Sequence, residues 1–471
     1  MTNQKGRQFF VLDETMNLGK PFDSRPAMLE QGQRIVCQRC GSSHRKPSVQ
    51  LPIGSYYCPT CIRYGRITSN GRLVIQPTES PAIDHHIVWP GALTPFQQKI
   101  SQQLVSNCRQ KRSSLVWSVT GSGKTEMIFE TIRYVRQEGG RVAIVSPRID
   151  VCRELFPRIQ QAFPQEESLL LYGKSEEPYR YTNILIATTH QLLHFYRSFQ
   201  LIVVDEVDAF PYEGDAQLRY GLYNALAKNG CLIYLSATPS ERLLQEIRGK
   251  FAVLKMPLRF HQRPLIVPKP VHYSHWAQAY RRKRWLRPLL LQLQRLLQKN
   301  FVLVFCPSIA LMKEVEAAVR RQGTSWSLTS VSSQDQKRSE KVASARRQIY
   351  KVLFTTMILE RGVTFENVSV IVLGANHPVF TKSVLVQIAG RVDRKGAYTE
   401  GEVIFFYDQM TEAIRKALNE IKEMNQLAKS WLTDVVGVKG LFLENERSLR
   451  CWLLGVSQKM NCARNVPNSF Q

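Results

Sequence analysis

From about residue 93 onwards, short and wholly apolar runs alternate with amphipathic stretches. A short apolar run rich in β-branched residues is typical of a strand in a parallel sheet, because helices cover both faces of such a sheet. Helical patterns such as residues 125–137 lie between the runs. The alternation predicts two doubly wound α/β units. The predicted strands are 114–119, 141–145, 184–187, 201–204 and 232–235 in the first unit, and 302–305, 327–331, 352–354, 368–373 and 401–406 in the second.

Prolines and a change of pattern divide the chain further. Pro257, Pro264, Pro268 and Pro270 exclude a regular helix or central strand between the two units, which indicates a linker. A basic helical stretch follows at about 275–299, with a kink or restart expected at Pro288, and the chain again reads as helical from about 409.

Before residue 91 the pattern is different. This region is rich in Pro, Gly and Arg, with β-like stretches at 32–36, 55–58 and 72–75. After it, Thr94-Pro95 predicts the start of a helix, with Thr94 as the N-cap. We therefore expect five segments. They are an N-terminal region at 1–90, a first α/β lobe at 91–256, a linker at 257–272, a second lobe at 273–425 and a C-terminal helical extension at 426–471.

The composition favours a polyanionic partner. The 471 residues include 64 Lys and Arg against 38 Asp and Glu, a formal net charge of +26. Such an excess is typical of proteins that bind nucleic acid or an anionic membrane face. Hydrophobic residues at 44% and charged residues at 22% argue against wholesale disorder. No apolar run reaches the length that crosses a bilayer, and the first ten residues lack a secretory pattern, so we expect a cytoplasmic location.

The strongest chemical motif is a Gly-rich loop between the first predicted strand and its helix. Residues 118–125 read Ser-Val-Thr-Gly-Ser-Gly-Lys-Thr. In such a loop the backbone N–H groups, with Gly121, Ser122 and Gly123 at its tip, surround phosphate groups, and the helix dipole adds to the attraction. Lys124 would reach the β- and γ-phosphates of ATP, and Thr125 would place its hydroxyl on Mg²⁺. Ser118 stands where Gly or Ala is usual.

A pair of acids completes this predicted nucleotide site. Asp205 and Glu206 follow the apolar run 201–204, so the carboxyl end of that strand would place them at the mouth of the sheet. Asp205 would hold the Mg²⁺ shell, and Glu206 would orient and deprotonate the attacking water. Loop and acids together predict a nucleoside-triphosphate hydrolase.

Four of the ten cysteines form a compact pattern. Cys37-x₂-Cys40 is followed after 17 residues by Cys58-x₂-Cys61, the spacing of a two-knuckle zinc ribbon spanning about 34–66. Four thiolates would close a structural Zn²⁺ site and leave no open position for catalysis. The alternatives are replacement of one ligand by His44, two disulfides, or four free thiols. The other six cysteines, at 108, 152, 231, 306, 451 and 462, are expected to be buried thiols.

Two basic regions leave alternatives open. Basic and aromatic residues surround the cysteine cluster and would together grip a single strand, or the tyrosines would instead form the core of the small ribbon. These residues are Arg34, Arg39, Arg45, Lys46, Arg63 and Arg66, with Tyr56, Tyr57 and Tyr64. The run Tyr280-Arg281-Arg282-Lys283-Arg284-Trp285 would contact phosphates or an anionic membrane surface, or simply form a solvated helix face.

The order of motifs resembles the superfamily 2 helicases. The matching stretches, in chain order, are Leu93–Gln97, Pro147-Arg148, Thr188–Gln191, Asp205–Asp208, Ser236–Thr238, Thr355 through Val363, and Gln387 through Arg394. This resemblance implies two RecA-like lobes with ATP between them. It also implies that Gln97 reads adenine, that Gln387 contacts the water or γ-phosphate, and that Arg391 and Arg394 approach the γ-phosphate as arginine fingers. Arg148, Thr188, Thr189 and Thr356 would grip the strand.

A four-cysteine ribbon before a compact two-lobe motor resembles the ComFA family, late competence ATPases of transformable Gram-positive bacteria. The phrases that carry this resemblance are 188–193, 263–268 and 358–362, while Asp393 departs from a position where a small residue is commoner. The resemblance implies a single-stranded DNA translocase for uptake of transforming DNA. It also implies ComFC-like and ComEC-like partners at the uptake channel. Peripheral contact with the inner face of the membrane and an oligomer are options that the sequence leaves open. The alternatives are a primosomal replication-restart helicase, an RNA helicase, and a nucleic-acid-binding ATPase switch that does not translocate.

Overall fold

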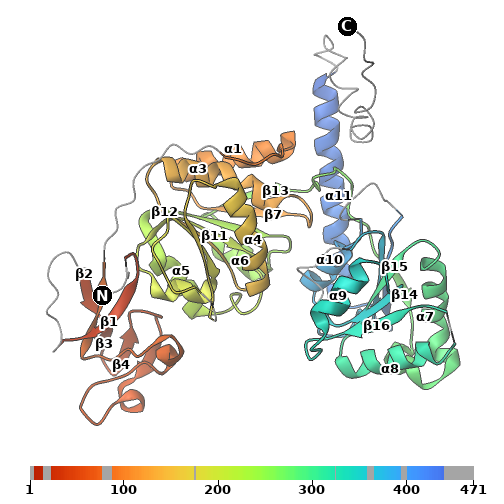
Figure 1. Cartoon of the computed structure of the whole chain (residues 1–471), viewed down its shortest axis with the longest axis horizontal. Coiled ribbons are helices and arrows are strands. Elements are labelled where there is room, and N and C mark those ends of the chain that lie inside the picture. The colour runs from red at the N-terminus through yellow and green to blue at the C-terminus, as the bar shows by residue number, and fades with distance from the viewer. Residues whose placement is uncertain are drawn as a thin grey trace, which may run out of the picture.

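Two parallel β-sheets with helices on both faces make up most of the chain (Figure 1). The computed structural model describes residues 5–13, 23–76, 87–173, 175, 177–323, 325–357, 365–393 and 400–439, with side chains to residue 433. In Figure 1 the first sheet lies at the centre and the second at the right, with a small β-rich region at the left. The predicted architecture, two α/β lobes after a β-rich region, is confirmed.

Lobe 1 is built on a seven-stranded sheet in the order β13-β7-β12-β11-β8-β10-β9. All its pairings are parallel. Alternate residues of central strand β8 enter opposite cores, Val142 and Ile144 on one face and Ala143 and Val145 on the other. The strands are β7 Ser114–Ser118, β8 Val142–Ser146, β9 Ser168–Leu171, β10 Ile184–Thr188, β11 Phe199–Asp205, β12 Leu226–Ser236 and β13 Ala252–Met256.

Helix α1 begins where the sequence predicts. Thr94 caps α1 through a capping box with Gln97, and Pro95 occupies the first helical position. The helix expected at 125–137 is two helices, because the α-helix is interrupted at Ile128. The lobe 1 helices are α1 Pro95–Arg109, α2 Lys124–Met127, α3 Phe129–Gln137, α4 Ile149–Ala162, η4 Thr189–His194, α5 Ala216–Ala225 and α6 Glu241–Ile247.

Lobe 2 repeats this architecture on six parallel strands in the order β14-β19-β18-β15-β17-β16. On β15, Phe301, Leu303 and Phe305 enter one core, and Val302 and Val304 enter the other. The elements are β14 Lys269–His272, η5 Trp276–Arg281, α7 Lys283–Leu296, β15 Phe301–Phe305, α8 Ile309–Arg320, β16 Leu328–Val331, α9 Arg338–Arg346, β17 Val352–Thr355, β18 Val368–Leu373, α10 Lys382–Ala389, β19 Val403–Tyr407 and α11 Glu412–Lys439.

Two features of lobe 2 differ from the expectation. Lys269–His272, inside the expected linker, pairs with β19 as edge strand β14. An edge strand tolerates Pro270, because one side of it needs no ladder hydrogen bond. The basic helical stretch is interrupted at Arg282, where the backbone is extended, and Pro288 lies inside α7. Pro288 is the sixth residue of α7, so its missing N–H removes one backbone hydrogen bond near the start of the helix.

The N-terminal region contains two small antiparallel sheets, β1-β6-β2 and β3-β4-β5. Stretch 55–58, expected to be β-like, makes only isolated bridges, Tyr56 to Gln50 and Tyr57 to Thr68. The elements are β1 Gln8–Leu12, β2 Asp23–Pro26, β3 Met28–Gln31, β4 Arg34–Cys37, β5 Ser43–Arg45, η2 Lys46–Val49, η3 Pro59–Tyr64 and β6 Gly71–Ile75.

Helix α11 connects the two lobes. It packs on α10 in lobe 2, and farther along it Trp431 stacks on Phe96 of α1 in lobe 1 at 5.5 Å between ring centroids. Lys99 lies over the same indole at 5.9 Å. The Asn425 side chain accepts from Leu265 N at 2.8 Å and donates to Leu265 O at 2.9 Å, which ties the interlobe segment to this helix.

Candidate nucleotide site and cysteine centre

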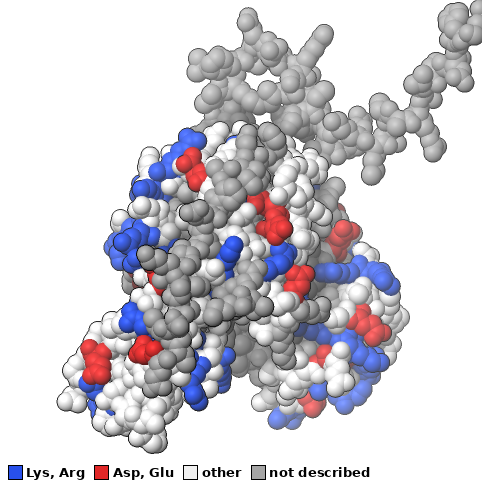
Figure 2. Space-filling view, turned by 60° about the vertical axis from the view of Figure 1, so that its left-hand side comes forward, with Lys and Arg blue, Asp and Glu red and all other residues white. Residues whose placement is uncertain are grey.

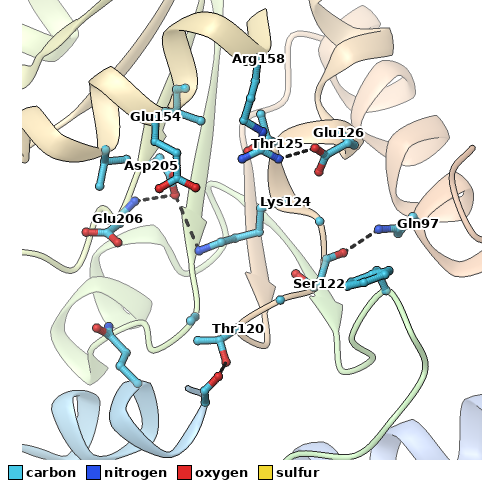
Figure 3. Close-up of a pocket in the computed structure, with 18 of the residues that line it drawn as sticks. Gln97, Thr120, Ser122, Lys124, Thr125, Glu126, Glu154, Arg158, Asp205 and Glu206 are labelled. Carbon is cyan, nitrogen blue, oxygen red and sulfur yellow. Dashed lines mark hydrogen bonds and ion pairs between the residues drawn. The ribbon is translucent and has the colours of Figure 1, made fainter. Parts of the chain in front are cut away.

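A cavity of about 570 Å³ lies between the lobes, at the carboxyl ends of the lobe 1 strands. Lobe 1 lines the cavity with the Gly-rich loop and both acids of the strand end. Lobe 2 contributes Gln387, Gly390 and Arg391, and Trp89 and Phe260 add aromatic rings. Figure 3 shows Lys124 pointing toward Asp205, with Glu206 beside it. The structure therefore brings the predicted loop and acids together at the expected edge of the sheet.

The Gly-rich loop needs its glycines. Gly121 and Gly123 have φ values of 80° and 74°, a conformation that side chains rarely adopt. A Cβ at Gly123 would also overlap the Gln97 amide. Gln97 Nε2 donates to Ser122 O at 2.7 Å, and Thr94 N donates to Gln97 Oε1 at 2.8 Å. Gln97, predicted to read adenine, is only 4% exposed and here supports the loop.

The two acids have different surroundings. Lys124 Nζ lies 3.7 Å from Asp205 Oδ1, and Glu206 N donates to the same oxygen at 2.8 Å. Glu206 has a positive φ of 54°, a backbone conformation that is uncommon for a residue other than glycine. Its Oε2 lies 3.6 Å from Arg148 Nε. Arg148, predicted to grip a strand, thus lies beside the carboxylate expected to activate water.

Asp208 links the lobes through a polar network that the motifs did not assign to it. Ser236 Oγ donates to Asp208 Oδ1 at 2.7 Å, and Thr238 Oγ1 donates to Oδ2 at 2.8 Å. From lobe 2, Gln387 Nε2 donates to Thr238 Oγ1 at 3.0 Å, and Ser383 Oγ lies 2.6 Å from the same hydroxyl. Gln387 therefore contacts lobe 1 directly, next to the acids.

The segment Gly390–Asp393, here called the finger loop, follows α10 and carries Arg391. Arg391 is 6% exposed and lines the cavity. Thr120 Oγ1 donates to Gly390 O at 3.2 Å, and a Cβ at Gly390 would overlap Thr120, so glycine permits this close approach of the lobes. Arg394 and residues 358–364 lie outside the described residues, as do Cys451 and Cys462. Cys108, Cys152, Cys231 and Cys306 are buried free thiols, as expected.

Several cavity residues were missed. Arg158 of α4 pairs with Glu126 of α2 at the cavity wall, and Glu154 lies one helical turn before Arg158 (Figure 3). Trp89 and Phe260 supply the aromatic part of the lining. No sequence signal marks them, because each is a single residue outside any recognised motif. Only their position in the wall of the cavity identifies these residues.

The four predicted zinc ligands meet in one buried cluster. The Sγ atoms of Cys37, Cys40, Cys58 and Cys61 all lie within 4.8 Å of one another. Cys37 to Cys61 is 3.7 Å and Cys40 to Cys58 is 3.6 Å. A tetrahedral site with Zn–S bonds of about 2.3 Å has sulfur–sulfur edges of about 3.8 Å. The cluster thus fits a tetrahedral zinc ion.

Side chains near the cluster have structural roles. Arg39 is buried, and its Nε donates to Cys61 Sγ at 3.4 Å while Nη2 donates to the carbonyls of Cys61 and Gly65. Such donors would stabilise thiolate charge. His44 Nε2 lies 3.8 Å from Cys58 Sγ, outside the four-sulfur set. The three tyrosines, at 56, 57 and 64, are partly buried against the ribbon core.

The ribbon and lobe 1 share a core. Leu193 of η4 packs in the same cluster as the four cysteines. Gln8 Nε2 donates to Leu193 O at 2.9 Å, Arg25 lies over the Tyr196 ring at 3.8 Å, and Tyr64 stacks on His190 at 6.2 Å. The ribbon is therefore fixed on the segment that carries the predicted strand-gripping threonines 188 and 189.

His194 makes this interface sensitive to acid. Burial, with the nearby Arg7 and Arg39 guanidinium groups, lowers the pKa of His194 to about 3. Between this value and the unfolded pKa of about 6.5, the unfolded chain binds a proton that the folded chain excludes, so the free energy of unfolding falls as pH drops. We expect His194 to remove at most about 2 kcal/mol between pH 7 and 5. In denaturant titrations, His194→Gln should lose less stability than wild type over this range; equal losses would contradict the assignment.

The basic run 280–285 lies on lobe 2, away from the cavity. Among the described residues, Arg281, Arg282, Lys283 and Arg284 make no ion pair and are exposed. Arg282 and Arg284 lie near the Trp285 ring at 4.7 and 5.8 Å. On the face in Figure 2, Lys and Arg are spread over the surface with fewer Asp and Glu between them. Of the helices within the described ranges, none combines the length and hydropathy needed to span a bilayer.

Two family models match the two lobes. Residues 91–241 match the type III restriction enzyme res subunit model, and residues 285–396 match the helicase conserved C-terminal domain. Among solved structures, Mss116p bound to single-stranded RNA and AMP-PNP has a TM-score of 0.50 at 18% identity, covering 68% of this chain and 70% of that one. That likeness concerns the fold alone. The domain models make the chain an ATP-hydrolysing enzyme of the helicase type.

Curated relatives cover nearly the whole chain. A competence protein ComFA from Streptococcus pneumoniae is 40% identical over 90% of this chain and 98% of its own length. ComFA from Bacillus subtilis is 36% identical over 84% of this chain and 87% of its own. Replication restart protein PriA from Chlamydia muridarum is 27% identical, but over only 37% of this chain and 25% of its own length. With this identity, coverage and site geometry, the chain belongs to the ComFA family of competence proteins.

Proposed function

We propose that this protein is an ATP-driven motor that moves single-stranded DNA during uptake in natural competence. The observation that carries the proposal is the interlobe cavity, in which nucleotide-binding groups of lobe 1 face Gln387 and Arg391 of lobe 2. Catalysis at such an interface requires closed lobes, so hydrolysis would be coupled to their relative movement. The competence role is supported by the ComFA relatives.

Within this proposal, each side chain of the cavity has a distinct task. The N–H groups of residues 121–123 and Lys124 would bind the phosphates of ATP. Thr125 and Asp205 supply oxygen atoms suited to Mg²⁺, the ion that would bridge and neutralise phosphate oxygens. Glu206 would orient water and accept its proton. Arg391 would neutralise charge that develops on the γ-phosphate, and Arg394 is proposed from its motif position as the second finger.

The Asp208 network would transmit the state of the nucleotide. Thr238 and Gln387 belong to different lobes and lie 3.0 Å apart through Oγ1 and Nε2. Loss of the γ-phosphate would remove the contacts of Gln387 and Arg391 with it, so the lobes would separate more readily. Of the lobe 1 residues predicted to hold the DNA backbone, Arg148 is partly exposed, whereas Thr188 and Thr189 are buried.

The cysteine cluster would hold a structural Zn²⁺. Its buried thiolates form a closed set with no open coordination position, so we assign it no step in hydrolysis. The proposed partners are ComFC-like and ComEC-like proteins at the uptake channel. The exposed cations 281–284 would give peripheral contact with anionic lipid at the inner face of the membrane.

The test is the ATPase rate with single-stranded DNA of increasing length. For a translocase we expect the rate to rise several-fold over the DNA-free rate, climb with length and then saturate, because longer strands permit more steps per encounter. The same series with single-stranded RNA of matched length is the control. An ATPase switch would reach its full rate as soon as one site is filled. Equal rates with and without any strand would overturn the proposal.

A further inference from the structure

Three consecutive residues after β13 touch both halves of the nucleotide cavity. Arg259, Phe260 and His261 belong to the segment between the lobes and to no recognised motif. Phe260 contacts the Gly-rich loop of lobe 1, while Arg259 and His261 contact the loop of lobe 2 that carries Arg391. The segment is thus placed to act within the site, in addition to joining the lobes.

Arg259 holds the finger loop by its backbone. It is 1% exposed, and its Nη1 donates to Val392 O and Asp393 O, both at 2.8 Å. Its Nη2 donates to Gly390 O at 3.4 Å. These carbonyls flank Arg391 on both sides at the carboxyl end of α10, where the helix dipole favours a cation. A planar guanidinium can bridge several carbonyls at once, which an ammonium group does less well.

The loop held in this way has an uncommon backbone. Asp393 has a φ of 52°, the left-handed region that few residues other than glycine adopt. His261 Nε2 lies 3.1 Å from Asp393 O, so a second side chain of the segment contacts this turn. Asp tolerates the left-handed conformation better than most residues, which gives the departure from a small residue at this position a physical reason.

Phe260 presents an aromatic ring to the cavity. Its N–H donates to Gly121 O at 3.0 Å, its ring lines the cavity, and it is 50% exposed. The amide of Gln97 is engaged at its oxygen by Thr94 and at its nitrogen by Ser122. A half-exposed ring beside the phosphate loop offers a flat apolar surface, and stacking on such a ring is a general way of binding a nucleobase.

We propose that this segment is part of the ATP site. Phe260 stacks on the base of the bound nucleotide, and Arg259 is a positioning residue that holds Arg391 toward the γ-phosphate. Both ends of one nucleotide are thereby connected through adjacent residues of the linker. This inference rests on the proposed ATPase site, but it requires no DNA-dependent step.

The two halves of the proposal predict opposite kinetic effects without DNA. Arg259→Lys should lower kcat at least about tenfold and leave the KM for ATP within about twofold, since Arg391 acts on the transition state. Phe260→Ala should raise the KM about tenfold and leave kcat within about twofold, and Phe260→Tyr should restore the wild-type KM. Val267→Ala, a partly exposed position in the same linker, is the matched control and should change neither value.

A probe without a base separates stacking from damage to the loop. Magnesium tripolyphosphate, used as a competitive inhibitor, should bind wild type and Phe260→Ala equally. Equal weakening of tripolyphosphate and ATP would overturn the stacking role. An Arg259→Lys variant with a lower melting temperature but an unchanged kcat would overturn the positioning role. All these rates are measured without DNA. Absence of DNA stimulation would therefore contradict the translocase proposal, but the roles of Arg259 and Phe260 could still be tested.

Discussion

Glu206→Gln should reduce ATP hydrolysis at least about a thousandfold while ATP still binds, because the amide cannot accept the proton of the attacking water. Gln has nearly the size of Glu and can keep the positive φ of 54° at this position about as well. The loop that binds the phosphates is left intact. Single-turnover hydrolysis and equilibrium binding of a fluorescent ATP analogue would measure the two effects separately.

Lys124→Ala is the matched comparison. It removes the ammonium group that lies 3.7 Å from Asp205, so both hydrolysis and ATP affinity should fall. The pair therefore separates proton transfer from phosphate binding at neighbouring positions. If Glu206→Gln lost ATP binding to the same extent as Lys124→Ala, the role of Glu206 as a base would be wrong. Asp205 would then be the better candidate.

Cys58→Ser should lower zinc content from one ion per chain toward zero and destabilise the N-terminal region by several kcal/mol, because a structural zinc site contributes folding energy directly. Cys58 is buried in the shared core, so a three-thiolate site would be left with an incomplete shell. Metal analysis, together with limited proteolysis of residues 23–76, would measure the effect. The melting of the two lobes should change far less.

Cys306→Ser is the control for this experiment. Cys306 is equally buried but lies in lobe 2, far from the cluster in sequence and outside the four-sulfur set. It should lower general stability without changing zinc content. Absence of zinc from the wild-type protein would contradict the ribbon assignment, and so would equal zinc loss in both variants.

Central strands were predictable because burial on both faces makes them continuously apolar. The run 368–373 gave β18 with its observed bounds. Edge strands β13 and β14 were missed, since alternate residues of β13 are exposed and β14 contains proline. Strand β9, with sequence Ser-Leu-Leu-Leu, was missed because a short apolar run cannot be distinguished from a buried helical segment.

Local sequence patterns predicted three parts of the candidate sites, and the motif order placed Gln387 and Arg391 of lobe 2 at the same cavity as the Gly-rich loop. The Gly-rich loop, the acid pair and the cysteine spacing each carry a local pattern, and the structure brings each set together. The Asp208 network joins residues up to 179 positions apart, and Arg259 meets Asp393 across 134 positions. No local pattern encodes such pairs, because each member alone resembles an ordinary polar residue. For Gln97 the opposite holds, because a motif identified the residue but not the contact that the structure shows. Its amide donates to the Gly-rich loop.

Helix α11 restricts how the lobes can separate. It packs on lobe 2, and its Trp431 stacks on Phe96 of α1 in lobe 1. Its Asn425 hydrogen-bonds Leu265 of the segment between the lobes. A helix that contacts both lobes can act as a pivot, so opening should be a rotation about the axis of α11, with little change in the distance between the lobes near Trp431. The largest displacement would fall on the surfaces most remote from this helix. The displacement of these surfaces in each ATPase cycle would then depend on their distance from α11. Interrupting α11 between Asn425 and Trp431 would uncouple ATP hydrolysis from translocation.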